Sequence, residues 1–261
     1  MIPQTAEFVT VTEIPGNKAS REQLERLYDR YHFAAAFCRD RDILEAACGA
    51  GMGLGYLART ARTVVGGDIN EIVLAIAQNQ YQGRPNIIVK KFDAQELPFP
   101  DQSFDVVLLY EAIYYLASPE KFVQEAKRVL RPGGRLIIGS VNKEWLDFNP
   151  SPFSRKYFTA AEVAEQLRPH FREIRAFGAF SVRAATPRDR IVSLFKRIAI
   201  KLRLMPKTMK GKELFKRIFF GRLVPIPPEL AVDGALDTPQ APLAIDTPNP
   251  QVKIFYVIAR R

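Results

Sequence analysis

The chain of 261 residues is poor in the residue types that build disulfide frameworks and metal centres. It has two cysteines, two histidines and one tryptophan. Two cysteines are too few for a disulfide framework, so we expect reduced thiols in a cytoplasmic protein, and no metal site is expected. The N-terminus lacks the basic and apolar regions of a signal peptide. The most apolar stretch, Val106 to Ala117, is short and carries Glu111, so no transmembrane helix is expected.

Positive charge is in excess, but it is concentrated in one segment. The whole chain has a net charge of +10, from 38 basic and 28 acidic residues. Between Ser181 and Pro225 there are 13 lysines or arginines and only two acids, a net charge of +11. The rest of the chain therefore has a net charge of −1, from 25 basic and 26 acidic residues.

Apolar runs alternate with helical patterns from Asp42 to Val141. This alternation predicts an α/β fold, a Rossmann-like, mostly parallel sheet of seven strands with helices on both faces. A helix capped by Ser20 should precede the sheet, and Thr159 with Glu162 should form a capping box at a later helix. The strands are expected at 43–47, 63–68, 87–92, 104–110, 135–141, 171–180 and 252–259, and further helices at 71–80 and 119–130.

Glycines and acids stand where the predicted strands end. The first strand carries Glu45 and runs into the glycine-rich turn 47–53. A strand, a glycine turn and a helix form a unit that presents backbone N–H groups to a ligand, although several nucleotide-binding families share it. The second strand ends in Asp68, close to the spacing at which a carboxylate binds ribose hydroxyls. The third strand is followed directly by Asp93.

Further motifs follow in a fixed order, LPFPDQSFDVV at 97–107 and RVLRPGG at 128–134. With these motifs in register, residues 42–141 resemble a class I S-adenosylmethionine-dependent methyltransferase of the small-molecule type. One departure is Ala47, where members of that family usually have the first glycine of the loop. Alanine is small, so we expect this change to be tolerated.

The resemblance implies S-adenosylmethionine as the cofactor, lying across the carboxyl ends of the strands. It implies that Glu45 binds the methionine end, that Asp68 accepts hydrogen bonds from the ribose hydroxyls, and that Asp93 binds the adenine amino group. The alternatives are a helix cap for Asp68 and a turn residue for Asp93. The position of both acids at strand ends, in the right order, favours the cofactor roles. The other residues expected at the cofactor are Ala47, Gly49, Gly51, Gly53, Ile69, Ala94, Tyr110 and Glu111.

Methyl transfer to oxygen or nitrogen can require a general base. The candidates are Tyr31, His32, Glu144 and His170, and His32 is preferred because it lies in a predicted lid. A single histidine can equally be structural. The loop after the fifth strand should lie over the acceptor, although its aromatic residues could instead pack against the lid. The residues expected to line the acceptor pocket are Tyr31, Glu144, Trp145 and Phe148.

The chain divides into four predicted segments. Residues 1–40 are an N-terminal helical extension or lid, 41–180 the methyltransferase core, 181–250 a basic amphipathic insertion with a proline-rich return, and 251–261 the last strand. The insertion holds two amphipathic patterns, within 190–205 and 212–223. A cap over the active site is favoured, and a surface for an anionic membrane or a lipid-linked acceptor is the alternative. Nucleic-acid binding is disfavoured because the segment is apolar as well as basic.

The sequence thus predicts a cytoplasmic methyltransferase, with membrane association left open. The acceptor is expected to be small or lipid-linked, O-methylation is favoured, and a sugar or other glycan precursor is one acceptor class. A scaffold that binds S-adenosylmethionine without turnover remains an alternative. So does a nicotinamide-dependent oxidoreductase, against which the Asp93-Ala94 pair and the Pro132-Gly133-Gly134 turn argue.

Overall fold

The computed structural model of the chain describes residues 12–151, 153–181, 223–231 and 240–261. The two amphipathic helices were predicted within 190–223. Except for Leu223, that range lies outside the described residues. Within the described ranges, no helix is long and apolar enough to span a membrane. The same ranges contain no group of three acidic, histidine or cysteine side chains that could hold a metal ion.

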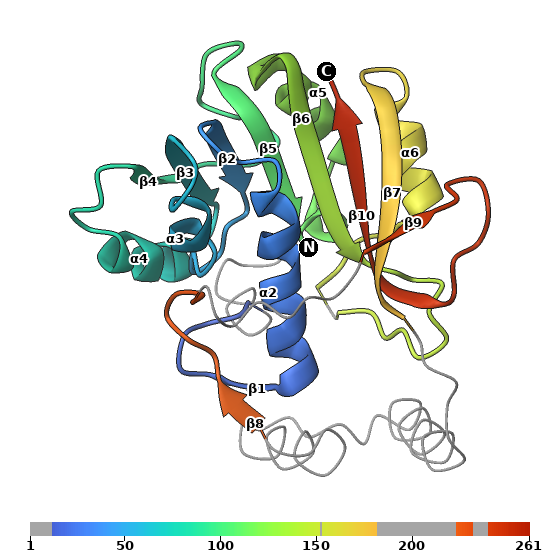
Figure 1. Ribbon diagram of the computed structural model, residues 1–261, viewed down its shortest axis with the longest axis horizontal. Helices are drawn as coiled ribbons and strands as arrows, with labels where there is room; N and C mark the ends of the chain where they lie inside the picture. The colour runs from blue at the N-terminus through green and yellow to red at the C-terminus, as the bar shows by residue number, and fades with distance from the viewer. Residues whose placement is uncertain (1–11, 152, 182–222, 232–239) are drawn as a thin grey trace.

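The described part is built on an eight-stranded sheet with the order β4-β3-β2-β5-β6-β10-β7-β9 (Figure 1). Strands β2 to β6 pair in parallel, whereas β10 is antiparallel to both β6 and β7, and β9 is antiparallel to β7. The mostly parallel α/β class predicted from the sequence is confirmed. The strands are β2 (Asp42–Ala46), β3 (Thr63–Asp68), β4 (Ile87–Lys91), β5 (Phe104–Tyr110), β6 (Leu130–Val141), β7 (Arg172–Ser181), β9 (Ala241–Leu243) and β10 (Val252–Arg260).

The sheet has one strand more than predicted, because β9 pairs with β7 in the segment expected to be an extended, proline-rich return. Pro242 lies in β9. Proline is tolerated there because β9 is an edge strand, so its missing N–H is not needed by a second neighbour. A separate two-stranded sheet joins β1 (Lys18–Ser20) to β8 (Leu223–Pro225) in antiparallel pairing.

Helices cover both faces of the sheet, as predicted. In Figure 1, α2 lies in front of the sheet and α5 and α6 lie behind it. The predicted capping box of Thr159 with Glu162 is present, and the predicted cap Ser20 also forms a capping box, with Gln23. The helices are α2 (Arg21–Ala35), α3 (Leu54–Leu57), α4 (Glu71–Gln80), η1 (Ile113–Tyr115, a 3₁₀ turn), α5 (Pro119–Val129) and α6 (Ala160–Leu167).

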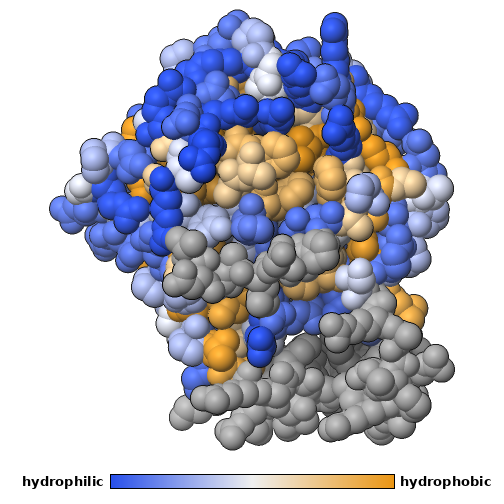
Figure 2. Space-filling model, viewed as in Figure 1, coloured by the Kyte–Doolittle hydropathy of each residue, from blue (hydrophilic) through white to orange (hydrophobic). Residues whose placement is uncertain are grey.

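The core has two apolar layers, one on each face of the sheet. Successive residues of a strand point to opposite faces, so Tyr256 belongs to the layer under α2 and its neighbour Phe255 to the layer under α5 and α6. Figure 2 shows an apolar area on the α2 side, over β6, β10 and β7, surrounded by hydrophilic residues. The partly buried Phe37 and Phe177 belong to the layer on this face.

The order of the strands fixes where a ligand can bind. The chain runs outward from β2 to β3 and β4 on one side, and then from β5 to β6 on the other. The direction of winding therefore reverses between β2 and β5. In open α/β sheets, the carboxyl ends of the strands at such a reversal leave a crevice that binds ligands.

Candidate cofactor and acceptor site

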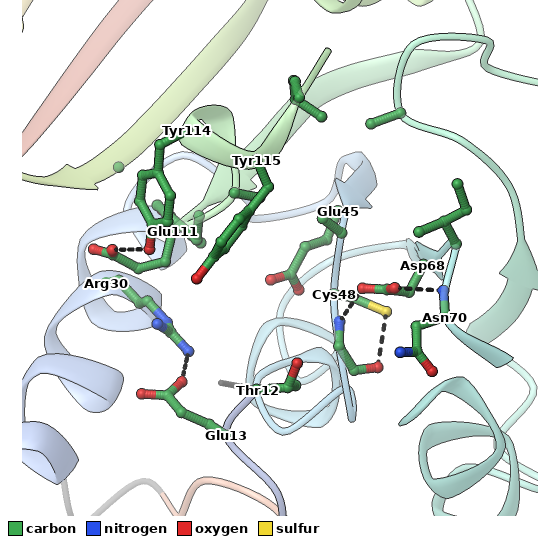
Figure 3. Close-up of a pocket in the computed structure, with 18 of the residues that line it drawn as sticks. Thr12, Glu13, Arg30, Glu45, Cys48, Asp68, Asn70, Glu111, Tyr114 and Tyr115 are labelled. Carbon is green, nitrogen blue, oxygen red and sulfur yellow. Dashed lines mark hydrogen bonds and ion pairs between the residues drawn. The ribbon is translucent and has the colours of Figure 1, made fainter. Parts of the chain in front are cut away.

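A cavity of about 660 Å³ lies at these strand ends (Figure 3). Its walls come from residues 12–13, from one face of α2, from the turn after β2, and from the segments after β3, β4 and β5. Ten residues predicted for the site line it. They are Tyr31, Glu45, Ala47, Gly49, Asp68, Ile69, Asp93, Ala94, Tyr110 and Glu111.

Glu45 is a buried carboxyl group with one oxygen left unpaired. Its side chain comes from β2 and the residue is 1% exposed. The Tyr31 hydroxyl donates to Oε1 at 2.6 Å, whereas Oε2 is buried and has no hydrogen-bond partner among the described residues. Burial raises the pKa of Glu45 to about 7, although the Tyr31 hydrogen bond and the charge of Arg30 oppose that rise. A buried acceptor without a partner is costly, so this oxygen marks a place for a ligand donor.

Asp68 ends β3 and fixes the turn after β2. Its Oδ2 accepts from the Gly49 N–H at 2.9 Å, and its Oδ1 accepts from the Asn70 N–H at 2.8 Å. Both Gly49 and Ala47 have positive φ, of 56° and 58°. The left-handed conformation costs a residue with a Cβ roughly 1–2 kcal/mol relative to glycine. This explains why glycine is the usual residue at position 47 and alanine a departure from it.

Gly51 and Gly53 were expected at the cofactor, but they do not line the cavity. A Cβ on Gly51 would lie 2.7 Å from the Cβ of Ala77, and a Cβ on Gly53 would lie 2.0 Å from the ring of Tyr31. These two glycines are therefore required for the close packing of the turn against α4 and α2. Of the three glycines, Gly49 alone lines the cavity.

His32 was predicted as the general base, and the structure does not place it in the cavity. Its neighbour Tyr31 lines the cavity, and adjacent residues on a helix point about 100° apart. No histidine is among the described residues that line the cavity. Neither His32 nor His170 is therefore positioned to take a proton from an acceptor there.

The other predicted acceptor residues, Glu144, Trp145 and Phe148, also lie outside the cavity lining. Glu144 accepts from the backbone N–H of Asn249 at 2.8 Å. The Trp145 ring packs against the charged groups of Arg26 and Lys253, at 5.6 and 5.2 Å. The loop that carries them is thus held by α2, by β10 and by the turn before β10. It meets the cavity wall through Arg26 and, by way of Tyr157, through Tyr114.

Charged and aromatic residues that the sequence reasoning missed form the other end of the cavity. Arg30 of α2 pairs with Glu13, and the Tyr114 hydroxyl donates to Glu111 Oε2 at 2.8 Å. Figure 3 shows Tyr115 between the Glu111–Tyr114 pair and Glu45. A signal existed in the sequence, because arginines four apart share a helix face, and because Tyr114 and Tyr115 stand in the short segment that follows β5.

Glu111 has an unusual conformation and environment. Its backbone φ is 51°, which is uncommon for a residue other than glycine and often marks a functional constraint. Burial raises the pKa of its carboxyl group, although Arg30 and the Tyr114 hydrogen bond oppose that rise. A carboxylate with a raised pKa is a better proton acceptor than one in water.

The fold and the cavity define a Rossmann-like protein that binds a nucleotide-type cofactor. Residues 44–138 match the family model described as "Methyltransferase domain". The chain therefore carries a class I S-adenosylmethionine-dependent methyltransferase domain, and S-adenosylmethionine is the cofactor of that class.

Known proteins agree with this assignment. The chain is 34% identical over 172 residues to a protein of Mycolicibacterium smegmatis described as "Probable S-adenosylmethionine-dependent methyltransferase", covering 64% of this chain and 65% of that one. It is 42% identical over 114 residues to the fatty-acid O-methyltransferase of the same species, covering 41% and 40%. The chain thus spans less than two thirds of the length of these relatives. A methyltransferase structure from Thermotoga maritima shares the fold, with a TM-score of 0.58 over 91% of each chain at 18% identity.

The residues present fit this cofactor. The cavity presents an unpaired carboxylate oxygen on Glu45, a second carboxylate on Asp68 at the end of the neighbouring strand, and a third on Asp93. S-adenosylmethionine has three matching groups: a cationic methionine end, a pair of ribose hydroxyls and an adenine amino group. One of these acids can bind each of them. Ile69 is 47% exposed and lines the same cavity, where a flat ring can cover it.

We expect the affinity for S-adenosylmethionine to rise with pH between about 5 and 7. Burial raises the pKa of Glu45 to about 7, so the free protein holds a proton there over much of this range. A cation next to Glu45 favours the carboxylate, so binding releases up to one proton and tightens by up to about tenfold per pH unit.

Calorimetry at pH 6 in two buffers of different ionisation enthalpy measures the proton release. Tyr31→Phe removes a hydrogen bond that lowers the pKa of Glu45, so it should move the affinity profile to higher pH. Binding without proton release at pH 6 would contradict the proposed place of Glu45 at the cationic end.

Proposed function

We propose that this protein transfers a methyl group from S-adenosylmethionine to a small or lipid-linked acceptor. Oxygen is the favoured methylated atom, and a sugar or other glycan precursor is one acceptor class. The observation that carries the proposal is the cavity itself, in which Glu45 and Asp68 stand at adjacent strand ends and a separate polar end remains for an acceptor.

The proposed cofactor contacts come from three neighbouring strands. Glu45 binds the methionine end, and Asp68 accepts from the ribose hydroxyls while it holds the turn through Gly49. Asp93 binds the adenine amino group and the Ala94 N–H a ring nitrogen. The order β2, β3, β4 in the sheet supports this assignment, because it spaces the three groups along the crevice.

S-adenosylmethionine supplies a methyl group that is already activated, so the protein has chiefly to align the acceptor and exclude water. Tyr31 and Tyr110 contact each other edge to face at 5.7 Å and wall the middle of the cavity. At the acceptor end, Glu111 is the carboxylate placed to take a proton from an acceptor hydroxyl. In this proposal Glu111 replaces the histidine expected from the sequence.

A lipid-linked acceptor is supported by the fatty-acid O-methyltransferase among the relatives. Contact with an anionic membrane through residues 181–225 remains part of the proposal. The alternative is a protein that binds S-adenosylmethionine without turnover, because one fold can carry unrelated functions.

Calorimetric titration with S-adenosylmethionine, with NADH as the control ligand, is the first test. Binding of S-adenosylmethionine alone is the expected result. Transfer of a labelled methyl group to a panel of hydroxylated lipids, sugars and fatty acids then tests turnover. Binding without transfer to any member of the panel would favour the alternative, and binding of NADH alone would refute the proposal.

A further inference from the structure

One face of α2 presents a row of polar side chains to the acceptor end of the cavity. Gln23, Arg26 and Arg30 all line it, at the spacing of three and four residues that places side chains on one helix face. Arg155 lines the same end from the segment before α6. Against these three arginines stand Glu13 and Glu111 in the lining, while Glu22, the partner of Arg26, is also paired with Lys253. Among the described residues this end of the cavity therefore has four cations and three carboxylates, one positive charge in excess.

The two arginines of α2 keep unpaired donors in spite of their ion pairs. The Nε atoms of Arg26 and Arg30 are buried and have no hydrogen-bond partner among the described residues. The side chain of Arg26 is 22% exposed and that of Arg30 is 13% exposed. Buried polar groups in folded proteins almost always have partners. Two such donors, on side chains that both line one cavity, indicate an acceptor group supplied by a ligand.

The surroundings hold both guanidinium groups in place. Arg26 pairs with Glu22, which also accepts from Lys253, and it lies over the Phe180 ring at 5.7 Å. Arg30 pairs with Glu13 and lies over the Tyr31 ring at 5.4 Å. Such fixed guanidinium groups lose little freedom when they bind a planar or tetrahedral oxyanion.

Resting on the methyltransferase function proposed above, we propose that the acceptor carries an oxyanion, a carboxylate or a phosphate, which Arg26 and Arg30 bind. A neutral acceptor could satisfy the two donors, but it would leave the excess positive charge of this cavity end uncompensated. Hydrogen bonds between a guanidinium and an oxyanion are about twice as strong as neutral ones. The oxyanion fixes one part of the acceptor, while Glu111 and Tyr114 face another part.

Three probes with the same eight-carbon chain test this inference: octanoate, octyl phosphate and octanol. Each is titrated into the full-length protein with and without saturating S-adenosylhomocysteine. We expect at least one of the two anions to bind about 10- to 100-fold more tightly than octanol, as hydrogen bonds to charged groups allow. The stronger of the two anions identifies the carboxylate or the phosphate as the recognised group.

Variants of α2 separate recognition from folding. Arg30→Gln should remove most of the preference for the anion, and Arg30→Lys, which keeps the charge but lacks Nε, should retain only part of it. Arg21→Gln, on the same helix with a side chain that is 82% exposed, is the matched control and should bind the probes like the unchanged protein. The folding control is run at a pH well above the pKa of Glu45, where loss of the Arg30 charge no longer changes its ionisation. There S-adenosylhomocysteine should bind all three variants about as tightly as the unchanged protein, which shows that they are folded.

Equal binding of octanol and both anions, or binding of neither anion, would overturn this inference. If S-adenosylhomocysteine still binds in that case, the methyltransferase proposal stands and only the nature of the acceptor is wrong. If S-adenosylhomocysteine itself fails to bind, the methyltransferase proposal fails, and the anion preference is judged from the titrations without it.

Discussion

Asp68→Ala is expected to lower the affinity for S-adenosylmethionine by about 100-fold or more, since hydrogen bonds to a charged group contribute roughly 1.5–3 kcal/mol each. The carboxylate is proposed to accept from two ribose hydroxyls. It also accepts from the N–H groups of Gly49 and Asn70. Its loss therefore removes ligand contacts and releases the turn that shapes the cavity.

Asp68→Asn keeps one acceptor oxygen and the size of the side chain, so its affinity should lie between those of Asp68→Ala and the unchanged protein. Asp101→Ala is the control, because Asp101 has a side chain that is 71% exposed and does not line the cavity. Calorimetry on the three variants gives the affinities. Undiminished binding to Asp68→Ala would refute the assignment of this strand end to the ribose.

Glu111→Gln is expected to slow methyl transfer to a hydroxyl acceptor by about 100-fold, within the range known for loss of a general base. The amide keeps the shape of the side chain but accepts no proton. Because Glu111 lies at the acceptor end, the affinity for S-adenosylmethionine should change little. The raised pKa of Glu111 further predicts that the rate in the unchanged protein falls as the pH drops and the carboxylate is protonated.

Single-turnover transfer of a labelled methyl group, measured as a function of pH, tests this role. Tyr114→Phe removes the hydroxyl that donates to Glu111, and that hydrogen bond lowers the pKa of Glu111. The variant should therefore shift the pH profile upward rather than abolish the rate. A rate for Glu111→Gln equal to that of the unchanged protein would mean that the acceptor atom needs no base.

The sequence by itself determined the order of elements and most of their bounds. The predicted strands 63–68 and 104–110 and the helix 71–80 have the same bounds in the structure. These elements are defined by local signals, apolar runs closed by glycine or acidic residues and a helix that begins after Asn70. The positions of the three acids proposed for the cofactor were predictable for the same reason. Glu45 lies one residue before the end of β2, Asp68 ends β3, Asp93 lies two residues after β4, and parallel strands end at one edge of the sheet.

Only the tertiary structure decided which residues line the end of the cavity that is proposed for the acceptor. Whether Tyr31 or His32 faces the cavity depends on how α2 is rotated against the sheet, and both lie in the same helical pattern. Trp145 does not line the cavity and packs against Lys253, a residue more than a hundred positions distant. The spacing of Arg26 and Arg30 already puts them on one face of a helix. That this face lines the cavity depends on long-range packing, which has no local periodicity, and was decided only by the placement of α2 against the strand ends.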